Sequence, residues 1–134
     1  MKEFRAQDLP LSCPPIESCE QKFENIYRLV KSNSLTHEAF LSNLEEKPSR
    51  KPRKNQTLCS LNAISFFANL EEIKNLRNGI ISFKKRKIAI GTIEPNFGVS
   101  KVDGSSHINL WAYKGVQIHT HFSILTEEED NEVG

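Results

Sequence analysis

The residues best suited to chemistry gather near the C-terminus, where residues 104–122 contain three of the four histidines and the only tryptophan. Because side chains alternate along a strand, His119 and His121 are expected on one face of a strand over residues 116–125. Such a pair can chelate a metal ion, but zinc needs at least one or two further ligands, and no carboxylate is placed to complete the set. We therefore predict solvent-facing histidines at these two positions and no metal site.

His107 begins the preceding strand, expected over residues 106–113, and strand starts lie at the rim of a sheet, where sites often form. Alternation places His107 on one face with Asn109, Trp111 and Tyr113. These side chains could hold a planar heterocycle by stacking on Trp111 and by hydrogen bonds from Asn109 and His107. The alternative is a polar rim beside a core tryptophan.

Two further candidates lie on earlier strands. Arg28 is flanked by Ile26 and Val30 on its face of a strand over residues 23–30, so its side chain either extends to the rim or lines a pocket. Ser65 lies among apolar residues in a short strand over residues 63–67. A hydroxyl there either serves a site or hydrogen-bonds the backbone.

Charge is distributed unevenly along the chain. The formal net charge is +1, and without five acidic residues in the tail it would be +6. A basic body could serve RNA, DNA or a nucleotide, although solvated lysines and a solvated tail are the simpler interpretation. The candidate nucleic-acid contacts come from two basic segments: Arg50, Lys51, Arg53, Lys54, Lys84 and Lys85.

The three cysteines are Cys13, Cys19 and Cys59, an odd count without an export signal. This pattern argues against a disulfide framework and indicates structural or incidental thiols. No apolar run approaches the roughly 20 residues that span a bilayer, and the N-terminus lacks the apolar region of a signal peptide. We therefore predict a cytoplasmic protein without a membrane partner.

The elements that must position these residues follow from periodicity and turn signals. Besides the strands above, we expect strands over residues 87–94 and 99–102, a helix within residues 34–46 and a helix over 69–79 that ends in a left-handed cap at Gly79. Residues 1–20 form an arm, 21–126 a single domain and 127–134 a disordered acidic tail. The predicted fold is α+β, with a bent, mainly antiparallel sheet of about six strands and two helices.

The order YRLV, then AISFFANLEEI, then a run of strands resembles the ADP-ribosyltransferase-like group, which includes bacterial toxin transferases and RNA 2′-phosphotransferases. Members bind NAD or a related ribose phosphate in a cleft of a split, bent sheet. They commonly carry an arginine or histidine on the first strand, a serine opening a middle strand, and a later glutamate. Arg28 and Ser65 match the first two, whereas neither Glu94 nor Glu127–Glu129 lies in a recognisable motif for the third.

The resemblance implies a small intracellular enzyme domain that handles NAD or an RNA-linked phosphate, in a toxin or phage-defence setting. Arg28 would grip a phosphate, Ser65 would position the ribose, and His107 with Trp111 would close the site. The missing glutamate puts transfer to proteins in doubt and affects an RNA phosphotransferase-like activity less. The organisation YRLV…SFF…HxxxWxY is also similar to small bacterial proteins, a likeness that implies no function.

Two other functions stay open. The chain could be a non-enzymatic immunity, antitoxin-like or adaptor protein that binds a protein partner through a sheet edge, its basic loop or its acidic tail. It could also be an RNA-binding protein that uses its basic loops.

Overall fold

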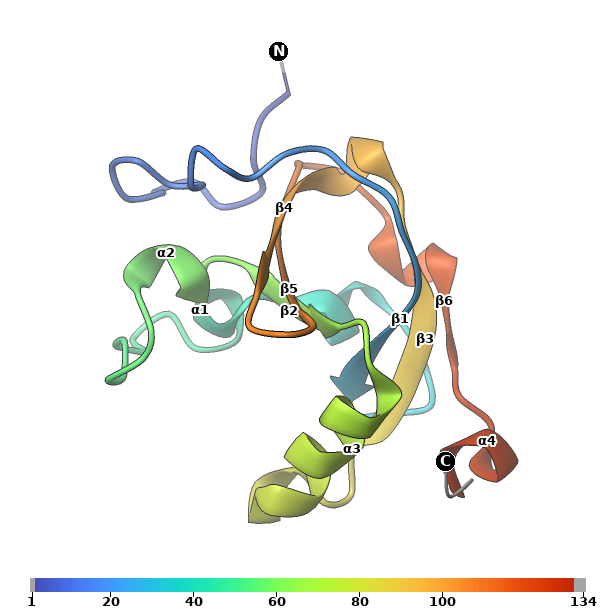
Figure 1. Cartoon of the computed structure of the whole chain (residues 1–134). Helices are drawn as coiled ribbons and strands as arrows, with labels where there is room; N and C mark the ends of the chain where they lie inside the picture. The colour runs from blue at the N-terminus through green and yellow to red at the C-terminus, as the bar shows by residue number, and fades with distance from the viewer. Residues whose placement is uncertain (1, 132–134) are drawn as a thin grey trace.

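The computed structural model describes residues 2–131 and has one curved sheet at its centre (Figure 1). Six strands form it in the order β4-β5-β2-β1-β3-β6, and every neighbouring pair is antiparallel. The predicted α+β class with a mainly antiparallel sheet is therefore confirmed. The strands are β1 Phe23–Val30, β2 Ile64–Phe67, β3 Lys87–Ile93, β4 Gly98–Asp103, β5 His107–Ala112 and β6 Phe122–Ile124.

Alternation along the strands gives the sheet two apolar faces. One face carries the main core, in which the rings of Phe40, Phe66 and Phe122 pack against one another. The other face carries a smaller cluster around Ile73 and Ile88. As predicted, Ile26 and Val30 share one face of β1, and both lie in the main core. Phe23 also packs against this core, because the register shifts between Phe23 and Ile26.

Short helices surround the sheet. They are α1 Asn43–Glu46, α2 Leu58–Leu61, α3 Leu70–Gly79 and α4 Glu127–Asn131, with 3₁₀ turns η1 His37–Phe40, η2 Ile81–Phe83, η3 Pro95–Phe97 and η4 Ile118–His121.

Two helix predictions need correction. The helix expected within residues 34–46 is split into η1 and α1, because Ser42 has extended backbone and starts a new helix through a capping box with Glu45. The second helix is present as α3, and Asn69 caps it by accepting a hydrogen bond from the Glu72 backbone. Gly79, however, is the last residue of α3 and does not adopt the predicted left-handed conformation.

The last predicted strand was wrong over its first half. Residues 118–121 form η4, and β6 begins only at Phe122. His119 and His121 therefore lie in a turn and not on one strand face. His121 meets the Phe97 ring edge-on at 4.8 Å, and His119 Nδ1 is buried without a partner among the described residues.

The N-terminal arm lies along the body. Phe4 bridges to Tyr113, Cys19 bridges to Ser100, and Arg5 forms a bidentate ion pair with Glu45.

A disulfide between Cys13 and Cys59 ties this arm to α2, so the expectation of structural or incidental thiols was wrong for these two cysteines. The odd count reflects one free, exposed cysteine, Cys19. Sequence spacing could not reveal the bond, because its partners are 46 residues apart and meet only when the arm folds back.

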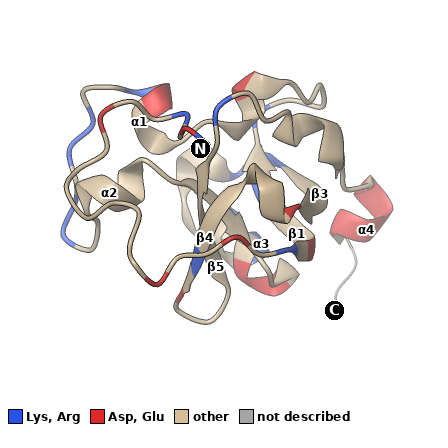
Figure 2. Ribbon diagram, turned by 90° about the horizontal axis from the view of Figure 1, so that it is seen from above, with Lys and Arg blue, Asp and Glu red and all other residues tan. Residues whose placement is uncertain are grey.

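The acidic tail is also more ordered than predicted. Residues 127–131 form α4, which Figure 2 shows as an acidic turn. Asp130 holds it against α3 through two hydrogen bonds from Arg77, at 2.9 and 2.6 Å. Residues 132–134 lie outside the described residues. Within residues 2–131, no helix is long and apolar enough to cross a membrane.

Candidate functional site

The sheet splits where β1 and β2 part. The two strands share a single registered pair, Tyr27 with Phe67, and diverge beyond it. Main-chain groups that a neighbouring strand would satisfy need other partners there, because buried backbone polar groups are rarely left unpaired. The divergence creates a gap in the middle of the sheet.

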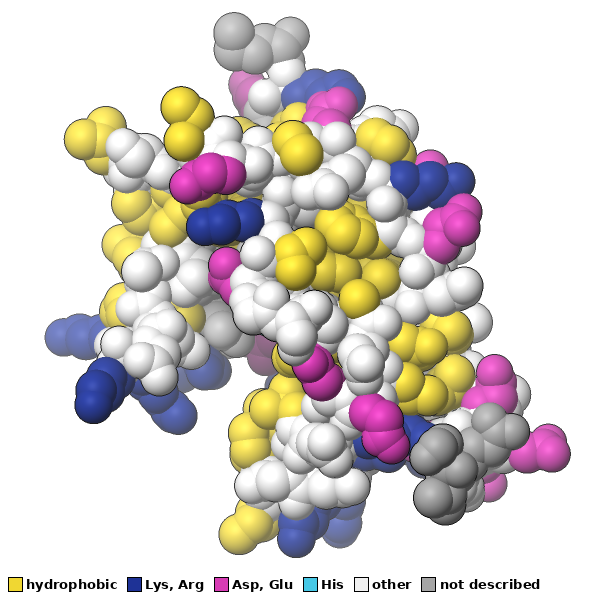
Figure 3. Space-filling view, viewed as in Figure 1, with side chains coloured by type: hydrophobic (Ala, Val, Ile, Leu, Met, Phe, Trp, Pro, Cys, Tyr) yellow, Lys and Arg dark blue, Asp and Glu magenta, His cyan; other side chains and the backbone are white. Residues whose placement is uncertain are grey.

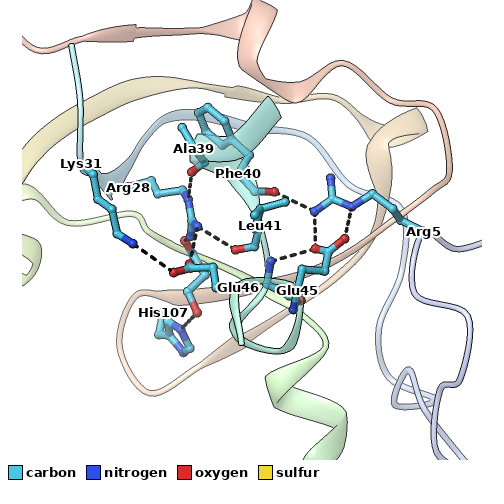
Figure 4. Close-up of polar contacts among 11 residues, drawn as sticks. Arg5, Arg28, Lys31, Ala39, Phe40, Leu41, Glu45, Glu46 and His107 are labelled. Atoms are coloured by element: carbon cyan, nitrogen blue, oxygen red, sulfur yellow. Dashed lines mark hydrogen bonds and ion pairs between the residues drawn. The ribbon is translucent and has the colours of Figure 1, made fainter. Parts of the chain in front are cut away.

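The side chain of Arg28 spans this gap (Figure 4). Its guanidinium donates hydrogen bonds to the carbonyl oxygens of Ala39, Ser65 and Leu41, each at 2.8 Å. An arginine has five N–H donors, so most of its capacity serves the backbone. Burial lowers the pKa of Arg28 to about 10, and Glu46 partly opposes this shift, so the group stays cationic near neutral pH. Arg28 is primarily a structural cation that lines the cleft described below.

His107 reaches the same point from the other side of the gap. Its Nε2 lies 3.0 Å from the Ser65 hydroxyl, a diagonal contact between the neighbouring strands β5 and β2. Burial lowers the pKa of His107, and the nearby charge of Asp103 opposes this. A neutral imidazole beside a hydroxyl is the arrangement that general-base activation requires.

The structure thus brings the three predicted catalytic residues together around Ser65. Arg28 binds the Ser65 carbonyl, and His107 contacts its hydroxyl. Asn109 lies behind this pair, 2% exposed, and donates a 2.6 Å hydrogen bond to Asp103.

Trp111 and Tyr113 do not join them. Trp111 is 3% exposed and donates its indole N–H to the Cys59 carbonyl, beside a space of only about 10 Å³. That space holds no more than about one water. Tyr113 donates its hydroxyl to Glu20 on the arm, and its pKa rises to about 12 because of burial and this carboxylate. Neither residue lines the cleft described below, because the arm and α2 cover that end of β5.

A cleft of about 530 Å³ opens at the split. Arg28, Ser65, His107 and Asn109 line it from the sheet. Its other walls are the loop between α1 and α2 and the segment from α3 to β3. The charged residues that line it are four arginines (Arg28, Arg50, Arg53 and Arg86) and two carboxylates (Glu46 and Asp103).

The cleft arginines come from two basic segments that are distant in sequence. Figure 2 shows the run of Lys and Arg between α1 and α2. In Figure 3, basic side chains gather over that loop and again below the C-terminal end of α3, with a hollow between them. Arg50 and Arg53 come from the first segment and Arg86 from the second. Each basic segment therefore contributes at least one arginine to the cleft, although Lys84 and Lys85, the candidates named in the second segment, do not line it.

Three of these guanidiniums retain donors for a ligand. Within residues 2–131, Arg53 has no side-chain hydrogen bond or ion pair, and Arg86 contacts only the Phe83 ring, at 4.8 Å. Arg50 Nε is buried and has no partner in the same part of the chain. A buried donor without an acceptor costs roughly 1–3 kcal/mol, a cost that an anionic ligand would remove.

The remaining predicted basic contacts lie beside the cleft. Lys51, Lys54, Lys84 and Lys85 are exposed and do not line it. They add positive potential around the mouth, where charges steer anions toward a site.

The glutamate of the cleft is a residue that sequence reasoning missed. Glu94 pairs with Lys22 at 3.7 Å, and neither it nor Glu127–Glu129 lines the cleft. Glu46 does, 4.0 Å from Arg28 and 3.7 Å from Lys31. Its position depends on the split of helix 34–46, so no local motif could have marked it.

Comparison with known proteins assigns neither a family nor a function to the chain. No family model, no curated protein and no solved structure matches the chain.

Proposed function

We propose that the cleft binds a phosphate-bearing ribonucleotide, either within a dinucleotide such as NAD or at the end of an RNA strand. The observation that carries this is the arginine lining: four guanidiniums face two carboxylates in a cavity of about 530 Å³. Arginine binds phosphate oxygens through paired N–H groups. The volume lies within the range of roughly 300–1,000 Å³ typical of small-ligand sites.

Each wall would have a separate task. Arg50, Arg53 and Arg86 would hold the phosphate, since their donors are free, while Arg28 holds the sheet open behind it. The apolar ring of Phe83 offers a surface on which a base can stack. The resemblance had given the phosphate contact to Arg28, and this assignment gives it to Arg50, Arg53 and Arg86 instead.

We further propose that an ADP-ribosyltransferase-like or phosphotransferase-like reaction would use His107 and Ser65. His107 would accept a proton from a reacting hydroxyl, and Ser65 would orient the ribose. Glu46 is the carboxylate closest to the role that the resemblance gives to a glutamate. A toxin or phage-defence role rests on the resemblance alone.

Calorimetric titration with NAD, ADP-ribose, inorganic phosphate and a short RNA ending in a phosphate tests the binding. The Arg53→Gln/Arg86→Gln double variant should lose affinity by at least about tenfold, because hydrogen bonds to charged groups contribute roughly 1.5–3 kcal/mol each. The matched control is Lys22→Gln/Lys114→Gln, which removes two exposed cations outside the cleft. Equal affinities for the two double variants, or no binding of any of these ligands, would refute the proposal.

A further inference from the structure

A second cavity continues the cleft. Its volume is about 580 Å³, and it lies beyond the end of β1, lined by residues of the segment from Lys31 to Thr36. The residues that line both cavities are Arg28, Leu29, Leu41, Glu46, Arg50 and Arg86. The two cavities therefore adjoin along this shared wall, and together we call them the split groove.

The split groove is larger than one nucleotide requires. Each cavity alone lies in the range of roughly 300–1,000 Å³ that encloses a small ligand. The His107–Ser65 pair lies only in the first, and Lys31 and Lys47 only in the second. A ligand that filled both would extend from the paired side chains to the far side of β1.

Cations line both cavities of the split groove. Arg53 lies in the first cavity, Arg50 and Arg86 at the shared wall, and Lys31 and Lys47 in the second cavity. The second cavity also has two carboxylates, Glu38 and Glu46, but more basic than acidic side chains line it. The Lys31–Glu46 pair is 3.7 Å apart with Lys31 70% exposed, and such surface pairs are weak enough for a phosphate to replace. A row of cations suits a ligand with repeated charge better than a ligand with one charged end.

The first cavity also offers a stacking surface, next to the shared wall at Arg86. The guanidinium of Arg86 lies 4.8 Å from the centre of the Phe83 ring. Bases of single strands stack on aromatic rings and on arginine planes, and this contact tolerates any base. A duplex hides its base faces, so this surface favours an unpaired strand.

We propose that the split groove binds a single strand of nucleic acid several nucleotides long. One phosphate-bearing nucleotide lies in the first cavity, and the strand continues past Arg86 and Arg50 toward Lys31 and Lys47. This inference rests on the proposed function of the cleft and names its ligand as a polymer.

Fluorescence anisotropy with labelled oligouridylates of about two, four and eight nucleotides tests the inference, since site sizes on single-strand grooves run to several nucleotides. Affinity should rise at least about tenfold from the shortest to the longest strand and fall with added salt. The same series in oligodeoxyuridylate distinguishes the sources. A preference for the ribo series assigns RNA, and equal binding assigns single strands of either sugar.

Substitutions in the second cavity test the binding of a strand separately from the binding of a single nucleotide. Lys31→Gln/Lys47→Gln should weaken the longest strand about tenfold and leave the affinity for a mononucleotide unchanged. Both lysines are exposed, so the fold should persist, as a thermal melt would check. Lys22→Gln/Lys114→Gln should change neither affinity. Mononucleotide binding with no length dependence overturns the inference and leaves the proposed function standing, whereas absence of all binding overturns both.

Discussion

His107 illustrates how a residue suggested by sequence acquires chemistry from its neighbours. Its place at the start of a strand follows from the turn at Asp103–Gly104, and its partner from the adjacent strand. Its Nε2 lies 3.0 Å from the Ser65 hydroxyl. Burial keeps the imidazole neutral to a lower pH than its ordinary pKa of 6.5 would allow. A base for proton transfer near neutral pH is thus present before any ligand binds.

This depressed pKa predicts a pH dependence of stability. Since the folded state disfavours the protonated ring, the unfolded state binds more protons as the pH falls through 6.5 and below. The folded protein should therefore lose stability over that range, and His107→Gln should lose less. Urea denaturation between about pH 5 and 8 measures this difference.

His37, on the exposed turn η1, supplies the control. His37→Gln removes an exposed imidazole by the same substitution and serves as the comparison. A slope for His107→Gln equal to that of the wild type would show that the ring is not desolvated in the folded protein.

At the scale of elements, the split between β1 and β2 is the feature that creates the cleft. Strands that paired along their whole length would leave no gap for side chains from both faces of the sheet. At the split, Arg28 donates to the carbonyl of Ser65 on β2, as a paired strand would, and also to the carbonyls of Ala39 in η1 and of Leu41 after it. Element boundaries, and not only residue types, therefore decide where the site lies.

Arg28→Ala should destabilise the fold by about 3 kcal/mol or more, because it leaves several buried carbonyls without donors and opens a cavity. Arg53→Ala should change the free energy of unfolding by less than about 0.5 kcal/mol, since its side chain has no partner within residues 2–131. Urea denaturation compares the two. Similar small losses for both would mean that Arg28 is free for a ligand and that the split is held in another way.

Across the whole molecule, the arm encloses one end of the sheet and leaves the other end open. It covers Trp111 and Tyr113, and the Cys13–Cys59 disulfide fastens it to α2. The residue after that disulfide cysteine, Ser60, lines the cleft, so the arm and the cleft wall are mechanically joined. Such a bond is more typical of an oxidising compartment than of the cytoplasm, and the cytoplasmic location stays a prediction.

We expect the disulfide to contribute measurably to the free energy of unfolding. Replacing both cysteines by serine should lower the free energy of unfolding by about 2–4 kcal/mol, because the bond closes a long loop in the unfolded chain. Cys19→Ser, at the exposed free thiol, should change it by less than about 0.5 kcal/mol. Thiol titration of the denatured, unreduced protein should find a single reactive thiol; three would show that the bond is absent.

The sequence by itself determined the features that depend on neighbours along the chain. The residue pattern predicted the bounds of β1 and the succession of strands along the chain, though not their order in the sheet. The turn before β5 is local in the same way, because Gly104 has a φ of 61°, which suits glycine. Charge clustering predicted phosphate contacts at Arg50 and Arg53, which line the cleft.

Only the tertiary structure decided which distant residues meet. Arg86 joins Arg50, Glu46 joins Arg28, and Cys13 joins Cys59 through the path of the folded chain, and no local pattern encodes that path. Trp111 has the same alternation as His107, yet the arm buries one while the cleft exposes the other. Local sequence sets which face a side chain takes, because backbone geometry is local. What covers that face depends on long-range packing, because burial of apolar surface stabilises the packing of any distant segment whose shape fits.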